Sequence, residues 1–214
     1  MERYVQMAKV NWKFNLMLHA LAVMMFCLVS PLIMGVENLN PIQTAQVLEL
    51  YISLSGIILC VPLFIPDEDK NIRDLILSKK ESVLLVHGIR IMEALLALMI
   101  FVGGFLFYLR MQECDFSFLT YYYGTMATCI FIGGLGVLVY SILDNLPAAY
   151  MVPLLYYIMC YGSGKKYFGK FYLFSMMRGS VEEKKYLLIA GLCMVAVGIL
   201  VRSPWKKIIM QLLG

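Results

Sequence analysis

Long apolar runs separated by short polar stretches are the dominant pattern of this chain. A helix needs roughly 20 mainly apolar residues to cross the hydrocarbon core of a bilayer, and the runs are close to that length. The pattern predicts an all-α polytopic membrane protein with six transmembrane helices, in one domain over 1–214. The predicted spans cover residues 14–34, 42–65, 86–109, 118–143, 148–161 and 186–201.

Composition supports the bilayer as the solvent of this fold. The chain is 61% hydrophobic and 15% charged, whereas soluble domains carry about 25% charged residues. Six spans and their connections use nearly the whole chain, so a separate soluble catalytic domain is not expected. The net charge of +4 gives no indication of a nucleic-acid partner.

The distribution of Lys and Arg predicts the orientation. With the N-terminus inside, more of the 18 basic residues flank the inner ends of the spans than the outer ends. Most basic residues on the opposite side fall in one polar stretch, 162–185. Both termini and the charged segment 67–82 are therefore expected in the cytoplasm.

Residues 1–13 have a basic face with Trp12 at its edge. This is typical of an amphipathic helix lying in the membrane interface. A simple basic flank that orients the first span explains the same residues, and the sequence does not choose between the two.

The segment 67–82 has the pattern of a separate amphipathic helix. Acidic residues crowd its start at Asp67, where they favour the positive end of a helix dipole, and Lys79 and Lys80 stand near its end. Ile72, Leu75 and Ile76 form one apolar stripe at helical spacing. An ordinary loop helix resting on the membrane would show the same features.

This segment resembles the ABC-2 type permease family. An acidic start, a Leu-rich stripe and a Ser before a basic residue occur there between the second and third spans. The chain departs from many members by having Asn71 in place of Gly. The matching positions are Glu68, Ile72, Arg73, Asp74, Leu75, Leu77 and Ser78.

The resemblance extends over the whole chain as a layout. The interfacial N-terminal helix, the six spans and the turn 144–150 with the following Pro153, Tyr156 and Tyr157 are similar to those of the family. Members carry re-entrant outer helices between the fifth and sixth spans, which implies an outer re-entrant or interfacial segment at 162–185.

The resemblance implies a function. The chain would be the permease subunit of an ATP-driven transporter, most simply an exporter, in a bacterial plasma membrane. Segment 67–82 would be the coupling helix that docks on a separate cytoplasmic ATPase. ATP, Mg²⁺ and hydrolysis would belong to that partner, so the chain itself would be no enzyme and bind no cofactor. A second permease subunit, identical or related, would complete the transporter.

Other candidate chemistry is sparse. The run 162–166 lacks the Gly and the Ser or Thr that a phosphate-binding loop requires. His19 and His87 stand without acidic or Cys clusters that would complete a metal site. The six cysteines are expected to be free thiols acting as small apolar residues.

Ionisable groups within predicted spans are costly and therefore suggest function. Glu49 and Glu93 are candidates for a translocation path. Snorkelling to the outer surface would also explain Glu49, and a pair with Arg90 on the same helix face would also explain Glu93.

Two other function classes remain open on the sequence. An ion-coupled carrier would use Glu49 and Glu93 directly, and a non-transporting scaffold or immunity protein would need no coupling helix. Glycines at 103–104, at 133, 134 and 136, and at 191 and 198 are interpreted as helix-packing seams.

Overall fold

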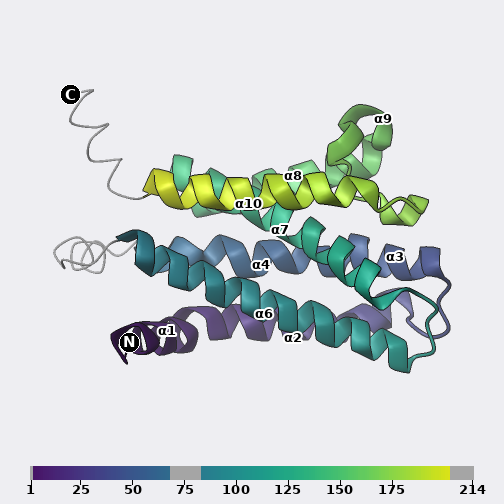
Figure 1. The fold of residues 1–214 in the computed structure, drawn as a ribbon, viewed down its shortest axis with the longest axis horizontal. Coiled ribbons are helices and arrows are strands. Elements are labelled where there is room, and N and C mark those ends of the chain that lie inside the picture. Colours follow the sequence, from purple (N-terminus) through teal and green to yellow (C-terminus); the bar gives the residue numbers. More distant parts are fainter. Residues whose placement is uncertain (1, 68–82, 203–214) are drawn as a thin grey trace.

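The computed structural model describes residues 2–67 and 83–202, which form a bundle of long helices (Figure 1). Those residues contain no strand, which confirms the all-α class. Five helical stretches are long and apolar enough to cross a membrane. They are Gln6–Met34, Pro41–Asp67, Leu84–Met111, Phe118–Leu143 and Glu182–Arg202.

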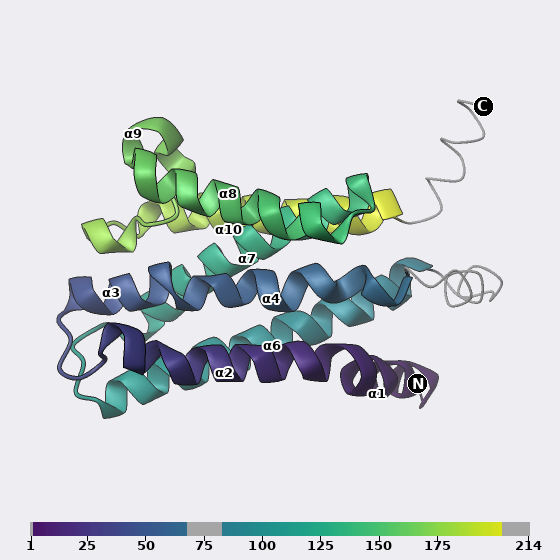
Figure 2. The ribbon, with the colours of Figure 1, turned by 180° about the vertical axis from the view of Figure 1, so that it is seen from behind.

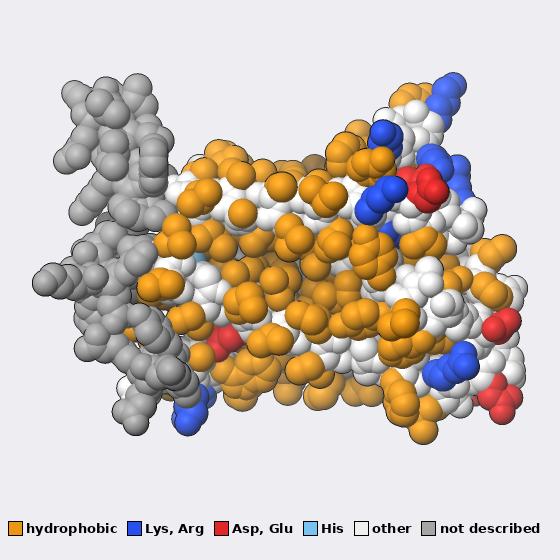
Figure 3. Space-filling model, in the orientation of Figure 1, with side chains coloured by type: hydrophobic (Ala, Val, Ile, Leu, Met, Phe, Trp, Pro, Cys, Tyr) orange, Lys and Arg blue, Asp and Glu red, His pale blue; other side chains and the backbone are white. Residues whose placement is uncertain are grey.

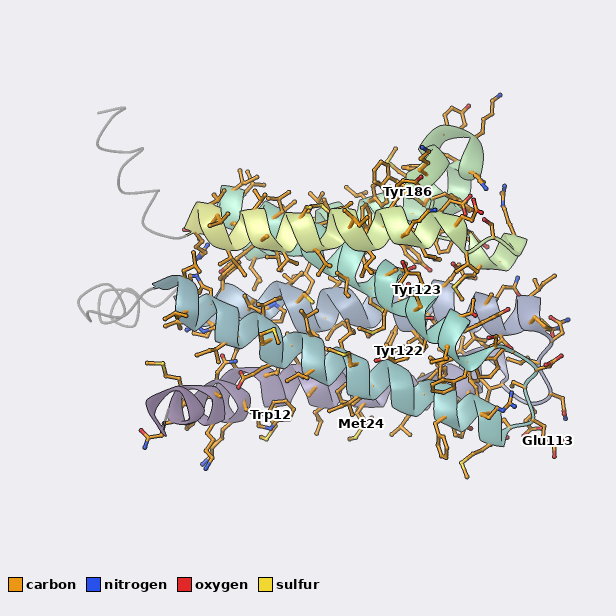
Figure 4. All side chains as sticks on the ribbon, in the orientation of Figure 1. Trp12, Met24, Glu113, Tyr122, Tyr123 and Tyr186 are labelled. Carbon is orange, nitrogen blue, oxygen red and sulfur yellow. The ribbon has the colours of Figure 1, made fainter. Side chains whose placement is uncertain are left out.

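The first stretch is two helices joined by a wider turn. α1 (Glu2–Asn11) continues through a π-helical turn, η1 (Trp12–Leu16), into α2 (Met17–Met34). Trp12 lies at this junction with an exposed side chain (Figure 4). The predicted boundary between residues 1–13 and the first span therefore coincides with a change of helix type, while the interfacial position of residues 1–13 stays a prediction.

The second span is broken, although an uninterrupted helix over 42–65 was expected. It consists of α3 (Pro41–Leu50), η2 (Ile52–Leu54), α4 (Ser55–Cys60) and η3 (Val61–Asp67). At the break, the Ser53 and Ser55 hydroxyls donate to the carbonyls of Glu49 and Ile52. Such hydroxyls compete with the backbone ladder. Pro62 and Pro66 lack the amide that an α-helix would use, and η3 is 3₁₀-helical there.

The start of the second span follows local rules that the sequence carries. Asn40 is the N-cap of α3. Its Oδ1 accepts from the Gln43 backbone amide, and the Gln43 Oε1 accepts from the Asn40 backbone amide. This reciprocal arrangement is a capping box, and Pro41 fits the first helical turn, where no amide partner is needed.

α6 (Val83–Met111) and α7 (Phe118–Leu143) match the predicted third and fourth spans closely. α7 packs along α10 (Glu182–Arg202) through small residues. A Cβ placed at Gly134 would lie 2.6 Å from the Gly191 carbonyl oxygen, and one at Gly198 would lie 3.0 Å from Val137 Cγ1. The predicted packing seams at 133–136, 191 and 198 are confirmed. At the expected seam 103–104, a Cβ at Gly103 would lie 3.6 Å from the Tyr122 ring, an ordinary contact, whereas nothing lies within 4 Å of one at Gly104.

α8 (Leu146–Ser163) is an 18-residue helix that packs on α7, and it is not among the five candidate spans. The turn before it is built as the sequence indicates. Asp144 takes left-handed backbone angles and Asn145 caps α8 by accepting from the Ala148 amide. Figure 2 shows α8 extending along the length of the bundle.

The connection from α8 to α10 is irregular but ordered. It contains α9 (Lys165–Phe168), η4 (Gly169–Phe171) and η5 (Met176–Arg178). Residues 172–176 within it are buried against the bundle. α10 begins four residues before the expected sixth span, which brings Glu182, Glu183 and Lys184 into its first turn.

The ends of the described segments gather at one end of the bundle. α1, the end of the second span, the start of α6 and the end of α10 lie together there, and α9 stands at the opposite end (Figures 1 and 2). We call these the terminal end and the α9 end. The described residues that flank 68–82, at the end of η3 and the start of α6, are therefore both at the terminal end.

Candidate functional site

The outer surface of the bundle is a broad apolar belt. Hydrophobic side chains cover its length in Figure 3, and most charged side chains lie towards the ends. Exposed Leu, Ile and Met side chains are found on α2, α6, α8 and α10. A surface of this kind suits lipid contact and leaves charged groups inside the bundle to be explained individually.

The first internal charge is an ion pair between Glu49 of α3 and Lys184 of α10. Glu49 Oε1 lies 2.5 Å from Lys184 Nζ, and neither side chain is exposed. Glu49 also accepts from the backbone amides of Met176 and Met177, at 3.0 Å each. The alternative that Glu49 snorkels to the surface is therefore wrong.

The ammonium group of Lys184 is fully satisfied. Besides Glu49, it donates to Thr128 Oγ1 of α7 at 2.7 Å and to the Leu173 carbonyl at 2.6 Å. Three donors meet three acceptors, which is what a buried ammonium requires. The pair thus ties α3, α7, α10 and the irregular segment before α10 together near the α9 end.

A second charge cluster lies at the terminal end. Asp67, the last residue of η3, accepts from Arg90 Nη1 at 2.7 Å and contacts His87 Nε2 at 2.8 Å. All three side chains are buried. Asp67 was expected to open the charged segment, and it instead closes the second span by binding α6.

Arg202 connects this cluster to α10 and α7. Its guanidinium lies 3.9 Å from Asp67 and donates to Asp144 at 2.6 Å. It also stacks over the rings of Phe64 and Tyr140, with centroid distances of 4.9 and 4.8 Å. The second, third, fourth and last candidate spans therefore meet at one group of charges.

Glu93 is not paired with Arg90, contrary to one interpretation of their spacing. Arg90 binds Asp67 and the Leu63 carbonyl, whereas Glu93 accepts from Asn11 Nδ2 at 2.5 Å. Spacing of three residues puts both on one helix, but the carboxylate that Arg90 contacts belongs to another span. Beside them is a small cavity lined in part by Asn11, Asn15 and Arg90.

The remaining predicted site residues belong to the charged segment between the second and third spans. The ATPase-coupling candidates lie in segment 68–82, outside the described residues; they are Glu68, Ile72, Arg73, Asp74, Leu75, Leu77 and Ser78. Among the described residues no group of His, Cys, Asp and Glu is arranged to hold a metal ion. All six cysteines are free thiols, as expected.

Sequence reasoning missed Lys184, Asp67, His87 and Arg202 as members of buried clusters. Lys184 was counted as a loop charge, because the polar run 182–185 precedes the apolar part of α10. Asp67 stood beside two further acids and so indicated a helix start. Isolated charges at span ends were the available signal, and their pairing depends on contacts between distant spans.

No protein-family model, curated protein or solved structure matches this chain.

Proposed function

We propose that the chain is the membrane subunit of an ATP-driven transporter of the ABC-2 type, working as an exporter with a separate cytoplasmic ATPase and a second permease subunit. α8 then serves as a sixth span, because an even number of passes returns the chain to the terminal end. Segment 68–82 is the element on which the ATPase docks, and both termini face the cytoplasm of a bacterial cell.

One observation carries this proposal. Asp67, the residue directly before segment 68–82, is buried and bound to His87 and Arg90. Val83, the residue directly after that segment, begins the same helix, α6. A partner that moves the segment would act at both ends on one helix, and through Arg202 on the last one. Such a linkage suits a rigid-body transfer of motion from a docked ATPase.

The two acidic candidates for a path divide under this proposal. Glu49 is bound to Lys184 and to two backbone amides, and it stabilises the packing at the α9 end. Glu93 is only partly buried and neighbours the small cavity, so it is the better candidate to face a moving substrate.

The experiment is co-expression with any ABC ATPase that is encoded beside this chain, followed by purification through a tag on the chain. Parent protein is expected to retain the ATPase and hydrolyse ATP. Leu75→Asp, at the centre of the apolar stripe of the segment, is expected to lose both. The matched control is Met111→Asp, which places the same carboxylate on an exposed site at the opposite end of α6.

Retention of the ATPase by Leu75→Asp would overturn docking at this segment. Absence of any co-purifying ATPase with the parent chain would overturn the transporter proposal itself, provided that the chain is inserted and monodisperse in detergent.

A further inference from the structure

The α9 end carries charge of two signs in separate places. The loops around Glu37, Glu113 and Asp115 are exposed and acidic overall, with Arg110 as their one basic residue; Glu113 is marked in Figure 4. The connection from α8 to α10 is basic, and Figure 3 shows its Lys and Arg side chains gathered near α9. An anion approaching this end is therefore attracted more strongly to the side of the α8–α10 connection.

The basic surface is defined by four exposed side chains, Lys166, Lys170, Arg178 and Lys185. Half-buried Lys165 adds a fifth charge, but it binds Glu183, which Ser180 also contacts. Glu182 is the other acid in this region. Five basic residues against two acidic ones leave a local charge of about +3, without counting the internally paired Lys184.

The backbone under this surface is held firmly. The Met176 and Met177 amides bind Glu49, and Tyr156 donates to the Phe171 carbonyl at 2.9 Å. Phe168 and Phe171 pack on the rings of Tyr156 and Phe131. The basic side chains therefore project from a fixed platform, which lowers the entropic cost of binding a ligand.

Aromatic rings hold the basic groups in place. Lys170 and Lys185 approach the same ring, that of Tyr186, at 4.9 and 5.6 Å from its centroid. Arg178 lies over Tyr172 at 5.0 Å. Figure 4 shows Tyr186 on α10 at the α9 end. Tyr next to Lys is typical of the level where membrane headgroups meet hydrocarbon.

The apolar belt continues directly from this surface. Ile158 and Met159 precede it on α8, Ile189 and Leu192 follow it on α10, and all four side chains are exposed. A molecule that contacts both surfaces needs acyl chains and a negatively charged head. This combination favours a lipid over a soluble anion.

We propose that the basic surface binds the phosphate-bearing headgroups of anionic phospholipids. Lys166, Lys170 and Lys185 contact the phosphate oxygens, and the lipid chains lie along α8 and α10. The site does not depend on the transport proposal, because it requires only that the chain spans a bilayer.

The test is photocrosslinking of the full chain in bilayer nanodiscs. Two probes are compared, phosphatidylglycerol and phosphatidylcholine with identical photoreactive chains, and adducts are located by peptide mass spectrometry. Phosphatidylglycerol is expected to label the exposed parts of α8 and α10 near the basic surface in preference to phosphatidylcholine.

In the variant Lys166→Gln/Lys170→Gln/Lys185→Gln, the ratio of phosphatidylglycerol labelling to phosphatidylcholine labelling is expected to fall roughly tenfold, since each basic group near an anionic surface contributes appreciably to binding. The matched controls are the triple Lys→Arg variant, which keeps the charge, and Lys9→Gln/Lys13→Gln, which removes charge at the other end. Both are expected to label as the parent does. Equal melting temperatures verify that the variants are folded.

Equal labelling by the two probes would overturn the proposal, as would an unchanged preference in the triple Gln variant. Competition by soluble glycerol phosphate at millimolar concentration would show a site for free phosphate and would overturn the lipid assignment.

Discussion

Glu49 and Lys184 form an ion pair of 2.5 Å between the second span and the last, with neither side chain exposed. Because both groups are buried, removing either one leaves the other inside the bundle without its counter-charge. Loss of one member of a buried pair typically costs about 3–5 kcal/mol, whereas replacing both by apolar residues is often neutral.

Lys184→Met is therefore expected to lower the thermal stability of the detergent-purified protein sharply, and Glu49→Leu to do the same. The double variant Glu49→Leu/Lys184→Met is expected to recover much of the loss. Thermal unfolding followed by size-exclusion chromatography measures all three. Additive losses in the double variant would show that the two groups act independently.

Asp67→Asn tests the charge cluster at the terminal end. The amide keeps the shape of the side chain but loses the charge that Arg90, His87 and Arg202 share. We expect lower thermal stability. On the proposed function, the ATPase still co-purifies, but its rate of ATP hydrolysis is stimulated less by binding to the chain or by substrate. The control is Asp144→Asn, because this exposed carboxylate binds Arg202 alone. An Asp67→Asn protein indistinguishable from Asp144→Asn would contradict a special role for Asp67.

Gly134 tests the closest helix contact. A methyl group there would lie 2.6 Å from a backbone oxygen of α10. The backbone cannot move aside as the end of a flexible side chain can, so the two helices would have to separate. Gly134→Ala is expected to cost about 1–3 kcal/mol, as overpacked cores do. Gly104→Ala, in an open position on α6, is the control and should leave the melting temperature unchanged. A harmless Gly134→Ala would mean that α7 and α10 are further apart.

Tyr157 tests the break in the second span. Its hydroxyl donates to the Leu50 carbonyl at 2.6 Å, next to the interruption between α3 and η2. Tyr157→Phe removes only that hydroxyl and should cost about 0.5–1.5 kcal/mol. Tyr161→Phe, four residues further along α8 and exposed, should cost less in the same unfolding measurement. Equal effects of the two changes would show that the hydrogen bond to the Leu50 carbonyl does not contribute to the free energy of unfolding.

The sequence predicts the helical class and most span positions well, because a bilayer imposes length and apolarity on every crossing segment. α7 was expected to occupy 118–143 and does so. Its ends are marked by local signals, a polar stretch before Phe118 and the turn at Asp144. Such signals need no knowledge of neighbouring helices.

The charge clusters could not be predicted in the same way. The partner of Arg90 is Asp67, which lies in another span, although Glu93 is nearer in sequence. The pairing depends on how α6 leans against η3. The break after Leu50 was also missed. Ser53 and Ser55 are compatible with an intact membrane helix, and only the structure shows that their hydroxyls donate to the backbone carbonyls of Glu49 and Ile52.

The distance along the chain between the partners of Glu49 has a consequence for biosynthesis. Met176, which binds its carboxylate, is 127 residues further on, and Lys184 follows later still. A ribosome delivers the second span to the membrane long before it completes α10. Until Met176 is made the acid has none of these partners, and until Lys184 follows it has no counter-charge; a charged side chain in a membrane helix carries an insertion penalty of a few kcal/mol. The nascent protein must therefore keep this helix sheltered until its last span arrives, and chains truncated before α10 should be recognised and degraded.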